Sequence, residues 1–395
     1  MRVICLVDCD SFYVSCERRD NPQYAGKPVC VLTGAGTRGI IVSRSKEAKE
    51  AGILMGKPLF MAQKTNPSAI YLPARIERYL EISKEVMCCL KSFSPVVEVV
   101  SVDEAYMDLT GLNEIYHQTY VELIRTIRRQ IAEKIGIPVS IGLATSKTLA
   151  KLASDKAKQT GGIFCISPKR VQETIGHLEI EAVCGVGKQT ARRLKQNGVF
   201  TVADFLAQPD SWVRQSLGKN GLLLKHELAG ESVSAVCSEE TLPKSIYHTG
   251  VIGDFSSNKN LLRSELQYHI HQACRKLREK GGFCGVIGVM LRQKNFQTDT
   301  EKKKLSSFTQ SEQEIGKVAE EMLEKLFREH ILYRSIGIEL ENLKYPDGQE
   351  ADLFCTTTLL PDKLGHAVDD LEQKFGKNIV QIGWFGRQDK ALKQK

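Results

Sequence analysis

Hydrophobic and polar positions follow one another in segments that predict a chain of mixed helices and strands. Residues 2–8 form an apolar run that ends in Asp8, which is typical of a buried strand with an acidic residue at its tip. Residues 12–19 and 79–93 have the apolar spacing of helices. Residues 96–109 are rich in β-branched residues around a polar centre, a pattern that predicts a hairpin.

A second set of segments continues this order. Residues 121–135 have helical spacing, and residues 139–144 read as a short strand. Ser146 is a good N-cap for a helix that would run to about Lys158. With residues 20–75 treated as an insertion, the order becomes strand, helix, two strands, helix, strand. This order predicts a ferredoxin-like α+β domain.

The rest of the chain predicts a helical part and a second mixed domain. Residues 166–236 read as short helices with tight turns, while residues 245–343 repeat the order strand, helix, two strands, helix, strand. The first helix of this second domain is expected at 258–280. A polar, lysine-rich connection at 294–304 is expected to join its two middle strands. A last helix is predicted at 363–375.

Composition is that of a globular chain and excludes several classes. The 395 residues are 42% hydrophobic and 26% charged, which does not fit a disordered or collagen-like protein. No apolar run reaches about 18 residues, so no contact with a membrane is expected. The N-terminal apolar run is too short for a signal peptide, and the 12 cysteines are scattered without a CxxC pair. Reduced thiols in a cytoplasmic protein are therefore expected.

Positive charge is concentrated in one part of the sequence. The formal net charge is +8, and residues 241–310 contain 12 basic but only 5 acidic residues, so this window holds most of the excess. A field of one sign favours a polyanionic partner, with nucleic acid ahead of an anionic membrane. An ordinary solvated surface is the alternative interpretation.

Three carboxylates stand out as candidate metal ligands. Asp8 ends the first predicted strand, and Asp103 and Glu104 lie in the predicted hairpin. Carboxylates at strand ends are costly unless they are paired or bind metal, and Mg²⁺ prefers oxygen ligands. Two Mg²⁺ ions held there could activate an attacking hydroxyl and stabilise the leaving oxygen of an in-line displacement. Alternatively, Asp8 caps a turn and the other two are exposed hairpin acids, which is the commoner arrangement for each acid taken singly.

Two motifs carry a resemblance to a known family. Residues 7–13 (VDCDSFY) and 101–108 (SVDEAYMD) resemble the two catalytic motifs of the Y-family, or translesion, DNA polymerases. The resemblance runs from residue 1 to about 385, and within the family it is to the UmuC-type branch, which includes the catalytic subunit of DNA polymerase V. It implies a template-directed, low-fidelity nucleotidyltransferase that adds dNTP to a primer 3′-hydroxyl in DNA damage tolerance and SOS mutagenesis.

The resemblance also implies an architecture. It is that of a right-hand α+β polymerase with five parts. They would be a ferredoxin-like palm at 1–15 and 77–165, small fingers at 16–76, a helical thumb with a helix-hairpin-helix at 166–240, a βαββαβ little finger at 241–345, and a tail at 346–395.

Site residues carried over from the family fall into a metal group and a nucleotide group. Asp8, Asp103, Glu104 and the backbone carbonyl of Cys9 would hold the two Mg²⁺ ions. Tyr13 would be the steric gate whose ring excludes a 2′-hydroxyl, although an aromatic core residue is the alternative. The residues expected to contact the nucleotide are Tyr13, Phe12, Arg44, Lys46, Lys49 and Lys158.

Lysines on two segments bear on the triphosphate. Lys147, Lys151 and Lys158 have the spacing of one helix face, and Lys158 resembles the family position that binds the triphosphate. An amphipathic surface helix would show the same spacing. Lys46 and Lys49 stand where the archaeal pattern has a tyrosine and an arginine, so the detailed phosphate contacts stay open.

DNA and protein partners are expected at three further places. Gly185, Gly187 and Lys188 resemble the helix-hairpin-helix turn that binds DNA phosphates, with an ordinary αα turn as the alternative. The little finger would follow the duplex through charge. Its expected contacts are Lys294, Lys302, Lys303 and Lys304. Gln349, Leu353 and Phe354 resemble the motif that docks on a sliding clamp. An accessory SOS subunit or recombinase filament is a further possible partner.

Two other functions compete with a polymerase. A nucleotide cyclase on a related palm would need neither the helix-hairpin-helix turn nor the basic domain. A catalytically idle DNA-binding adaptor predicts the loss of a metal carboxylate, whereas all three are present. Primer extension with dNTP and Mg²⁺ separates the three functions.

Overall fold

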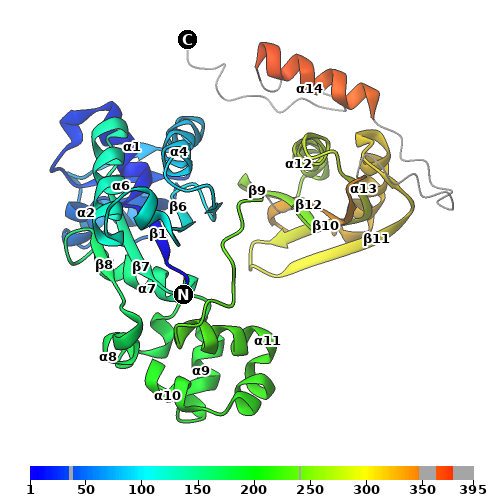
Figure 1. Ribbon diagram of the computed structural model, residues 1–395. Helices are drawn as coiled ribbons and strands as arrows, with labels where there is room; N and C mark the ends of the chain where they lie inside the picture. The colour runs from blue at the N-terminus through cyan, green and yellow to red at the C-terminus, as the bar shows by residue number, and fades with distance from the viewer. Residues whose placement is uncertain (35–38, 240–241, 347–361, 377–395) are drawn as a thin grey trace. The chain divides into compact units, whose positions relative to one another are not determined.

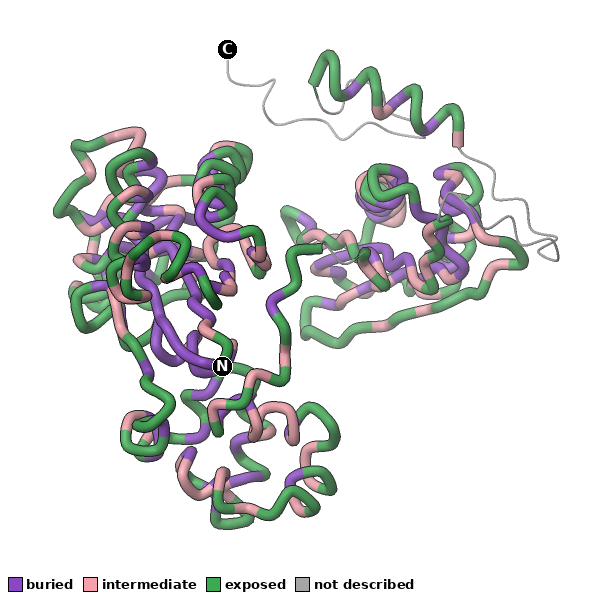
Figure 2. Tube along the Cα trace, in the orientation of Figure 1, coloured by how far each residue is buried: buried purple, intermediate pink, exposed green. Residues whose placement is uncertain are grey.

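The chain forms two compact units that divide between residues 240 and 241 (Figure 1). The computed structural model describes residues 1–34, 39–239, 242–346 and 362–376. Each unit has its own core, in which buried positions follow the strands and the inward faces of the helices (Figure 2). Within the described residues, no helix is both long and apolar enough to cross a membrane.

A five-stranded sheet organises the first unit. Its strands are β1 (Ile4–Cys9), β5 (Val97–Val99), β6 (Glu104–Asp108), β7 (Val139–Ala144) and β8 (Ile163–Cys165). They lie in the order β5-β6-β1-β7-β8, and all neighbours are antiparallel except β7 and β8. The first four strands have the order and directions of a ferredoxin-like sheet, which confirms the predicted fold class.

Helices cover both faces of this sheet (Figure 1). One face packs on α1 (Phe12–Asp20), α4 (Ile76–Lys91) and α6 (Tyr120–Ile135), with the short α5 (Leu112–Ile115) just before α6, and the other face packs on α7 (Lys147–Ala157). All six residues of β1 are buried, because successive side chains of a strand point to opposite faces and both faces are covered. Asp8, the next-to-last residue of this central strand, therefore lies at the end of a fully packed core.

Helix α7 makes its closest approach to the sheet at Gly142 of β7. A Cβ atom added there would lie 2.1 Å from the backbone nitrogen of Ser154 and 2.2 Å from the backbone oxygen of Ala150. Only glycine fits at such a contact. The backbone of α7 thus lies directly on β7, at the residue that pairs with Leu6 of β1.

The predicted insertion forms a small sheet of its own. Its strands lie in the order β3-β2-β4 around a small buried cluster. The elements are η1 (Pro22–Tyr24), β2 (Val29–Leu32), β3 (Ile41–Arg44), α2 (Lys46–Glu50), α3 (Leu59–Thr65) and β4 (Ile70–Pro73). The Ser45 hydroxyl accepts a hydrogen bond from the backbone N–H of Ala48 and caps α2, so the chain enters this helix at a defined angle.

A helical part completes the first unit, as the sequence predicts. Its elements are η2 (Pro168–Arg170), α8 (Val171–Ile175), η3 (Ile180–Ala182), α9 (Lys188–Gln196), α10 (Val202–Ala207) and α11 (Asp210–Leu228). Helix α11 is longer than expected, but its backbone leaves the helical region at Gly218, where φ is 69°. The hydrophobic cluster of this part is continuous with the α7 face of the sheet.

The second unit has the predicted order of elements. They are β9 (Ser245–Ser256), α12 (Lys259–Glu279), β10 (Phe283–Gln293), β11 (Thr298–Thr309), α13 (Glu312–Leu326) and β12 (Tyr333–Lys344). The strands lie in the order β11-β10-β12-β9, so the first strand is at an edge, whereas β1 is central in the first unit. One face of the sheet packs on α12 and α13.

The expected lysine-rich connection at 294–304 is wrong in its extent. β11 already begins at Thr298, so the connection comprises residues 294–297, and the three consecutive lysines lie within a strand. Consecutive strand residues point to opposite faces. Lys303 faces the helices, where its Nζ lies 2.9 Å from Glu321 of α13, while Lys302 and Lys304 point to the other face.

Helix α14 (Lys363–Phe375), which was expected in a separate tail, packs on α12 through buried charges. The fully buried guanidinium of Arg278 donates from Nε and Nη2 to the carboxylate of Asp369, at 2.7 and 2.8 Å. His271 lies 3.0 Å from Glu312 and 3.3 Å from Glu372. The hydrogen bond and charge of Glu312, with Glu372, outweigh burial and raise the pKa of His271. The helix is therefore attached by specific ion pairs.

Replacing Asp369 by asparagine is expected to lower the free energy of unfolding of the second unit by about 2 kcal/mol, because Arg278 would keep its charge but lose its bidentate partner. Urea-induced unfolding of the full chain, with hydrogen exchange across 363–375, measures the change. Asp370→Asn is the matched control, since Asp370 is the exposed neighbour on the same helix. Equal losses in both variants would show that the ion pair does not attach α14.

Candidate functional site

The tip of β1 and the turn between β5 and β6 meet at one end of the central sheet. Asp8 is opposite Glu104 in the register of β1 and β6. The backbone N–H of Cys9 donates to the backbone carbonyl of Asp103 at 2.8 Å. Strand pairing thus brings together acidic residues that are far apart in the sequence, as the hairpin hypothesis requires.

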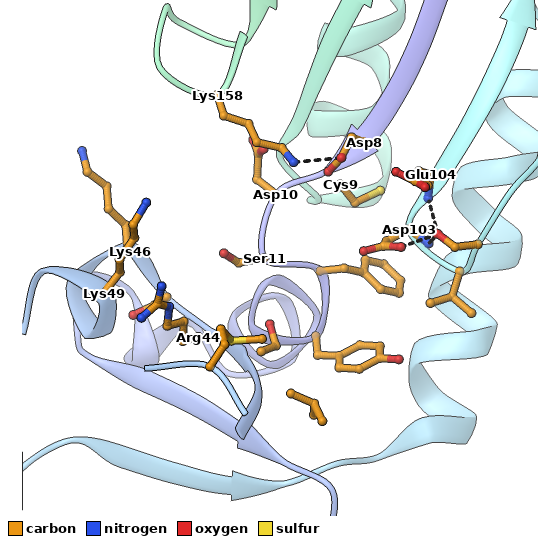
Figure 3. Close-up of a pocket in the computed structure, with 18 of the residues that line it drawn as sticks. Asp8, Cys9, Asp10, Ser11, Arg44, Lys46, Lys49, Asp103, Glu104 and Lys158 are labelled. Atoms are coloured by element: carbon orange, nitrogen blue, oxygen red, sulfur yellow. Dashed lines mark hydrogen bonds and ion pairs between the residues drawn. The ribbon is translucent and has the colours of Figure 1, made fainter. Parts of the chain in front are cut away.

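A cleft of about 880 Å³ opens over this end of the sheet (Figure 3). It is lined by residues from β1, α1, the β5–β6 turn, α7 and the three-stranded sheet with α2. All the expected metal and nucleotide residues line it. They are Asp8, Cys9, Phe12, Tyr13, Arg44, Lys46, Lys49, Asp103, Glu104 and Lys158.

Lys151 of α7 and Lys158, the C-cap residue of the same helix, contact the acids at the floor of the cleft. The Nζ of Lys151 lies 3.0 Å from Asp8 Oδ2 and 2.6 Å from Glu104 Oε2. The Nζ of Lys158 lies 2.8 Å from the same oxygen of Asp8 (Figure 3). Because one ammonium reaches both carboxylates, Asp8 and Glu104 are close enough to share a small cation.

The carboxylate of Asp103, which also lines the cleft, is hydrogen-bonded within its own turn. It accepts a hydrogen bond from the hydroxyl of Ser101, two residues earlier in the turn. Accordingly, the described part of the chain contains no group of three His, Cys, Asp or Glu side chains arranged to hold a metal. The structure brings Asp8 and Glu104 together, whereas Asp103 stays a prediction as the third ligand, with one of its two carboxylate oxygens bonded to Ser101.

The donor atoms nevertheless suit a hard divalent cation. Carboxylate and backbone carbonyl oxygens are the ligands that Mg²⁺ takes, and no thiol or imidazole competes among the residues that line the cleft, apart from the buried Cys9. Burial raises the pKa of the Cys9 thiol, so its side chain is a poor metal ligand. The residues therefore fit Mg²⁺ by chemistry.

The acids keep both lysines charged. Burial alone would lower the pKa of Lys151, but the hydrogen bonds and charges of Glu104 and Asp8 outweigh it and raise that pKa. The same balance, with Asp8 as the main partner, raises the pKa of Lys158. Both ammonium groups thus contribute full positive charge to the cleft.

Asp10 is an acid in this cleft that sequence reasoning did not select. Its carboxylate accepts a hydrogen bond from the Ser140 hydroxyl at 2.8 Å, and burial raises its pKa. Asp8 and Asp10 are two residues apart at a strand end, and this spacing could have drawn attention to it. Lys151 was also missed as a site residue, although its place on one helix face with Lys158 was the available signal.

Tyr13 has a rigid support on one side of the cleft. Its ring stacks on Tyr79 with centroids 4.6 Å apart and planes inclined by 17°. The buried hydroxyl of Tyr79 donates to Glu17 at 2.6 Å, and Glu17 accepts two hydrogen bonds from Arg75 at 2.8 Å. Phe12 packs against Tyr13 at 5.9 Å and is itself buried. The Tyr13 ring is therefore held in one position at the cleft wall.

Cations from the three-stranded sheet and α2 lie across the cleft from Lys158 (Figure 3). The Arg44 guanidinium donates to the backbone carbonyl of Ile53, which ties it to the loop that follows α2. Lys46 is 85% exposed and only 3.9 Å from Glu50, a weak surface pair. Lys49 is also exposed. An anion in the cleft would meet positive charge from both sides.

The expected DNA-binding turn has an open backbone. Gly185 has a φ of 93°, and Gly187 is the N-cap of α9. A Cβ at either glycine would meet no atom within 4 Å, so a phosphate could approach the peptide groups. Lys188 begins α9 and lines a shallow pocket of about 420 Å³ with Arg192 and Lys195 of the same helix. The turn thus leaves room for a phosphate near cationic side chains, although Lys195 is paired with Glu181, and DNA binding there stays a prediction.

The expected lysines of the second unit do not form one continuous surface. The Nζ of Lys302 lies 3.0 Å from Glu339 and 2.9 Å from Glu341 of β12, on the sheet face away from the helices. Lys303 faces the helices, as described above. Lys294 lies over the ring of Phe255, 5.5 Å from its centroid. Part of the basic excess is therefore balanced locally, which net charge alone does not show.

Comparison with known proteins identifies the family. Residues 7–155 match the impB/mucB/samB family, and residues 243–353 match the C-terminal domain of the same family. DNA polymerase IV of Clostridium kluyveri is 31% identical over 97% of this chain and 98% of its own length.

Solved structures agree. A chimera of the Y-family DNA polymerases Dbh and Dpo4 is 29% identical, covers 87% of this chain and 100% of its own, and superposes with a TM-score of 0.74. An insertion ternary complex of Dbh DNA polymerase is 28% identical, with the same coverage and a TM-score of 0.57. The chain described here therefore belongs to the impB/mucB/samB family and is a Y-family DNA polymerase.

Proposed function

We propose that this polymerase performs low-fidelity, translesion synthesis, adding dNTP to the 3′-hydroxyl of a primer in the cleft over β1. The observation that carries the proposal is the pairing of Asp8 with Glu104 at the floor of a cleft whose other walls bear Tyr13 and several cations. An acidic floor suits metal ions, and cationic walls suit the phosphates of a nucleotide. The relative solved as an insertion ternary complex supports the same use of the fold.

Asp8, Asp103 and Glu104, with the backbone carbonyl of Cys9, would hold the two Mg²⁺ ions. When bound, such ions would activate the attacking hydroxyl and stabilise charge on the leaving oxygen. Lys158 would bind the phosphates, since a compact ammonium on a flexible stem can follow them. Lys46, Lys49 and Arg44 would neutralise the same phosphates from the opposite wall.

Tyr13 would select the sugar. Its ring is fixed by Tyr79, so a sugar resting against it would have no room for a further hydroxyl. Duplex DNA would be held by the turn at Gly185, Gly187 and Lys188 and by the open sheet face of the second unit. These contacts carry charge but no base recognition, as synthesis on any template requires.

Several finer expectations stay predictions from the resemblance. The UmuC-type branch is not confirmed, since the curated relative reported above is named DNA polymerase IV. The role in SOS mutagenesis also stays a prediction, as do an accessory subunit and a recombinase filament as partners. The clamp motif, Gln349, Leu353 and Phe354, lies outside the described residues.

Isosteric removal of a proposed metal ligand tests the function. Asp103→Asn and Glu104→Gln are each expected to slow primer extension by at least about 1000-fold, equivalent to ~4 kcal/mol, because the ions would lose a charged ligand. Duplex binding, measured by fluorescence anisotropy, should be unchanged. Asp108→Asn, an acid at the far end of β6, is the matched control and should keep its activity.

Each other function gives a different result in the same assay. If Asp103→Asn extends primers at the normal rate, Asp103 is not a ligand of the catalytic metal ions. A nucleotide cyclase would form a cyclic product without DNA, and an idle adaptor would extend no primer even as wild type.

Tyr13→Ala is expected to reduce discrimination against ribonucleotides by about 100-fold, the scale on which one hydroxyl can be excluded by shape. The ratio of kcat/KM for dNTP and for the matching ribonucleotide measures it. Tyr13→Phe keeps the ring and should keep the discrimination. An unchanged ratio in the alanine variant would place the sugar gate elsewhere.

Because Lys303 and Lys304 lie on opposite faces of β11, we expect only one of them to affect the salt dependence of DNA binding. Lys304→Gln is expected to reduce the slope of log affinity for duplex DNA against log salt by about 1, because each phosphate contact contributes about 0.9. Lys303→Gln is the matched control and should not change the slope, since Lys303 faces α13. Equal slopes for wild type and Lys304→Gln would mean that DNA does not follow this face.

A further inference from the structure

Lys151 occupies the position between two carboxylates that are proposed to bind metal. Its Nζ lies within hydrogen-bond distance of both Asp8 Oδ2 and Glu104 Oε2, at 3.0 and 2.6 Å. The side chain of Lys151 is 17% exposed, and that of Asp8 is 9% exposed. The side chain of Glu104 is 23% exposed. Two partly buried carboxylates need a counter-charge, and among the described residues the ammonium of Lys151 is the one with ion pairs to both.

An ammonium and a divalent cation cannot share this position. Both seek the same carboxylate oxygens, and two positive charges a few ångströms apart repel each other strongly where little water screens them. Helix α7 cannot carry the ammonium away, because its backbone rests on β7 at Gly142. The four-carbon side chain of Lys151 can move by rotation about its own bonds, so exchange would need no change in the fold.

Lys158 does not have the same relation to the acids. It contacts Asp8 at 2.8 Å but has no contact with Glu104, and its side chain is 38% exposed. It also lies 3.4 Å from Asp155 on its own helix. Lys158 thus faces the open cleft, as a phosphate ligand would, whereas Lys151 bridges the acids beneath it.

We propose that Lys151 is a resident counter-ion of the metal site: without divalent ions its ammonium holds Asp8 and Glu104 together, and it withdraws when ions bind. This positioning role rests on the proposed function, because it takes the two acids to be ion ligands. Its consequence is that the free protein binds ions weakly, since an ion that binds Asp8 and Glu104 must displace this ammonium.

Metal binding to the free protein tests the proposal without any turnover. Mn²⁺ serves as the probe, and electron paramagnetic resonance counts the unbound ion in the absence of DNA and nucleotide. Lys151→Gln is expected to bind Mn²⁺ at least about tenfold more tightly than wild type, because nothing competes for the acids. Lys151→Arg keeps the charge and should stay near wild type. Lys147→Gln, one turn earlier on α7 and paired with Glu98, is the matched control.

Thermal unfolding gives a second, independent readout. Without divalent ions Lys151→Gln should melt at a lower temperature than wild type, and Mn²⁺ should raise its Tm by more than it raises that of wild type. If the variant does not fold without ions, added Mn²⁺ should restore the fold.

Three results would overturn the proposal. They are a Lys151→Gln protein that binds Mn²⁺ no more tightly than wild type, a Lys151→Arg protein that gains affinity equally, and a variant that Mn²⁺ fails to stabilise. Primer extension by the wild-type protein is measured alongside. Failure of extension there would contradict the proposed function, whereas normal extension with unchanged Mn²⁺ affinity would contradict only the role of Lys151.

Discussion

The pairing of β1 with β6 is the constraint on which the site depends. The register puts Asp8 opposite Glu104, and the hydrogen bond from Cys9 to the carbonyl of Asp103 fixes the turn beside the strand tip. β1 itself is buried on both faces, so it cannot shift without exposing its core residues. Carboxylates that would repel each other are thereby held together by apolar packing, and Lys151 and Lys158 compensate the charge.

Much of this arrangement could be predicted from the sequence, because it follows local patterns. The strand at Val139–Ala144 has the predicted bounds, and Ser146 caps α7 as expected. The catalytic motifs identified Asp8 and Glu104 through the resemblance. Their pairing across neighbouring strands needed only the expectation that the hairpin lies beside the first strand.

What could not be predicted depends on contacts between distant segments. The sequence around Asp103 does not show that Ser101 holds its carboxylate, and the spacing of α7 does not show that Lys151 bridges two acids. The strand order of the second unit could not be predicted from the order of its elements either, since the same order of elements gives a different sheet in the first unit. Counting charges along the sequence located the excess of basic residues in the second unit. It could not show that Lys302 and Lys303 are paired with acids, namely Glu339, Glu341 and Glu321.

The contact at Gly142 has a consequence for how this protein can vary. No atom of that residue reaches the cleft, yet even a methyl group there would lift α7 from the sheet and carry its lysines away from the acids. The loss of one surface lysine can be offset by another positive charge close to it. No residue other than glycine lacks a Cβ atom, so Gly142 cannot be replaced in this way. Glycine should therefore be conserved at position 142 as strictly as the acids of the cleft, although Gly142 takes no part in the chemistry.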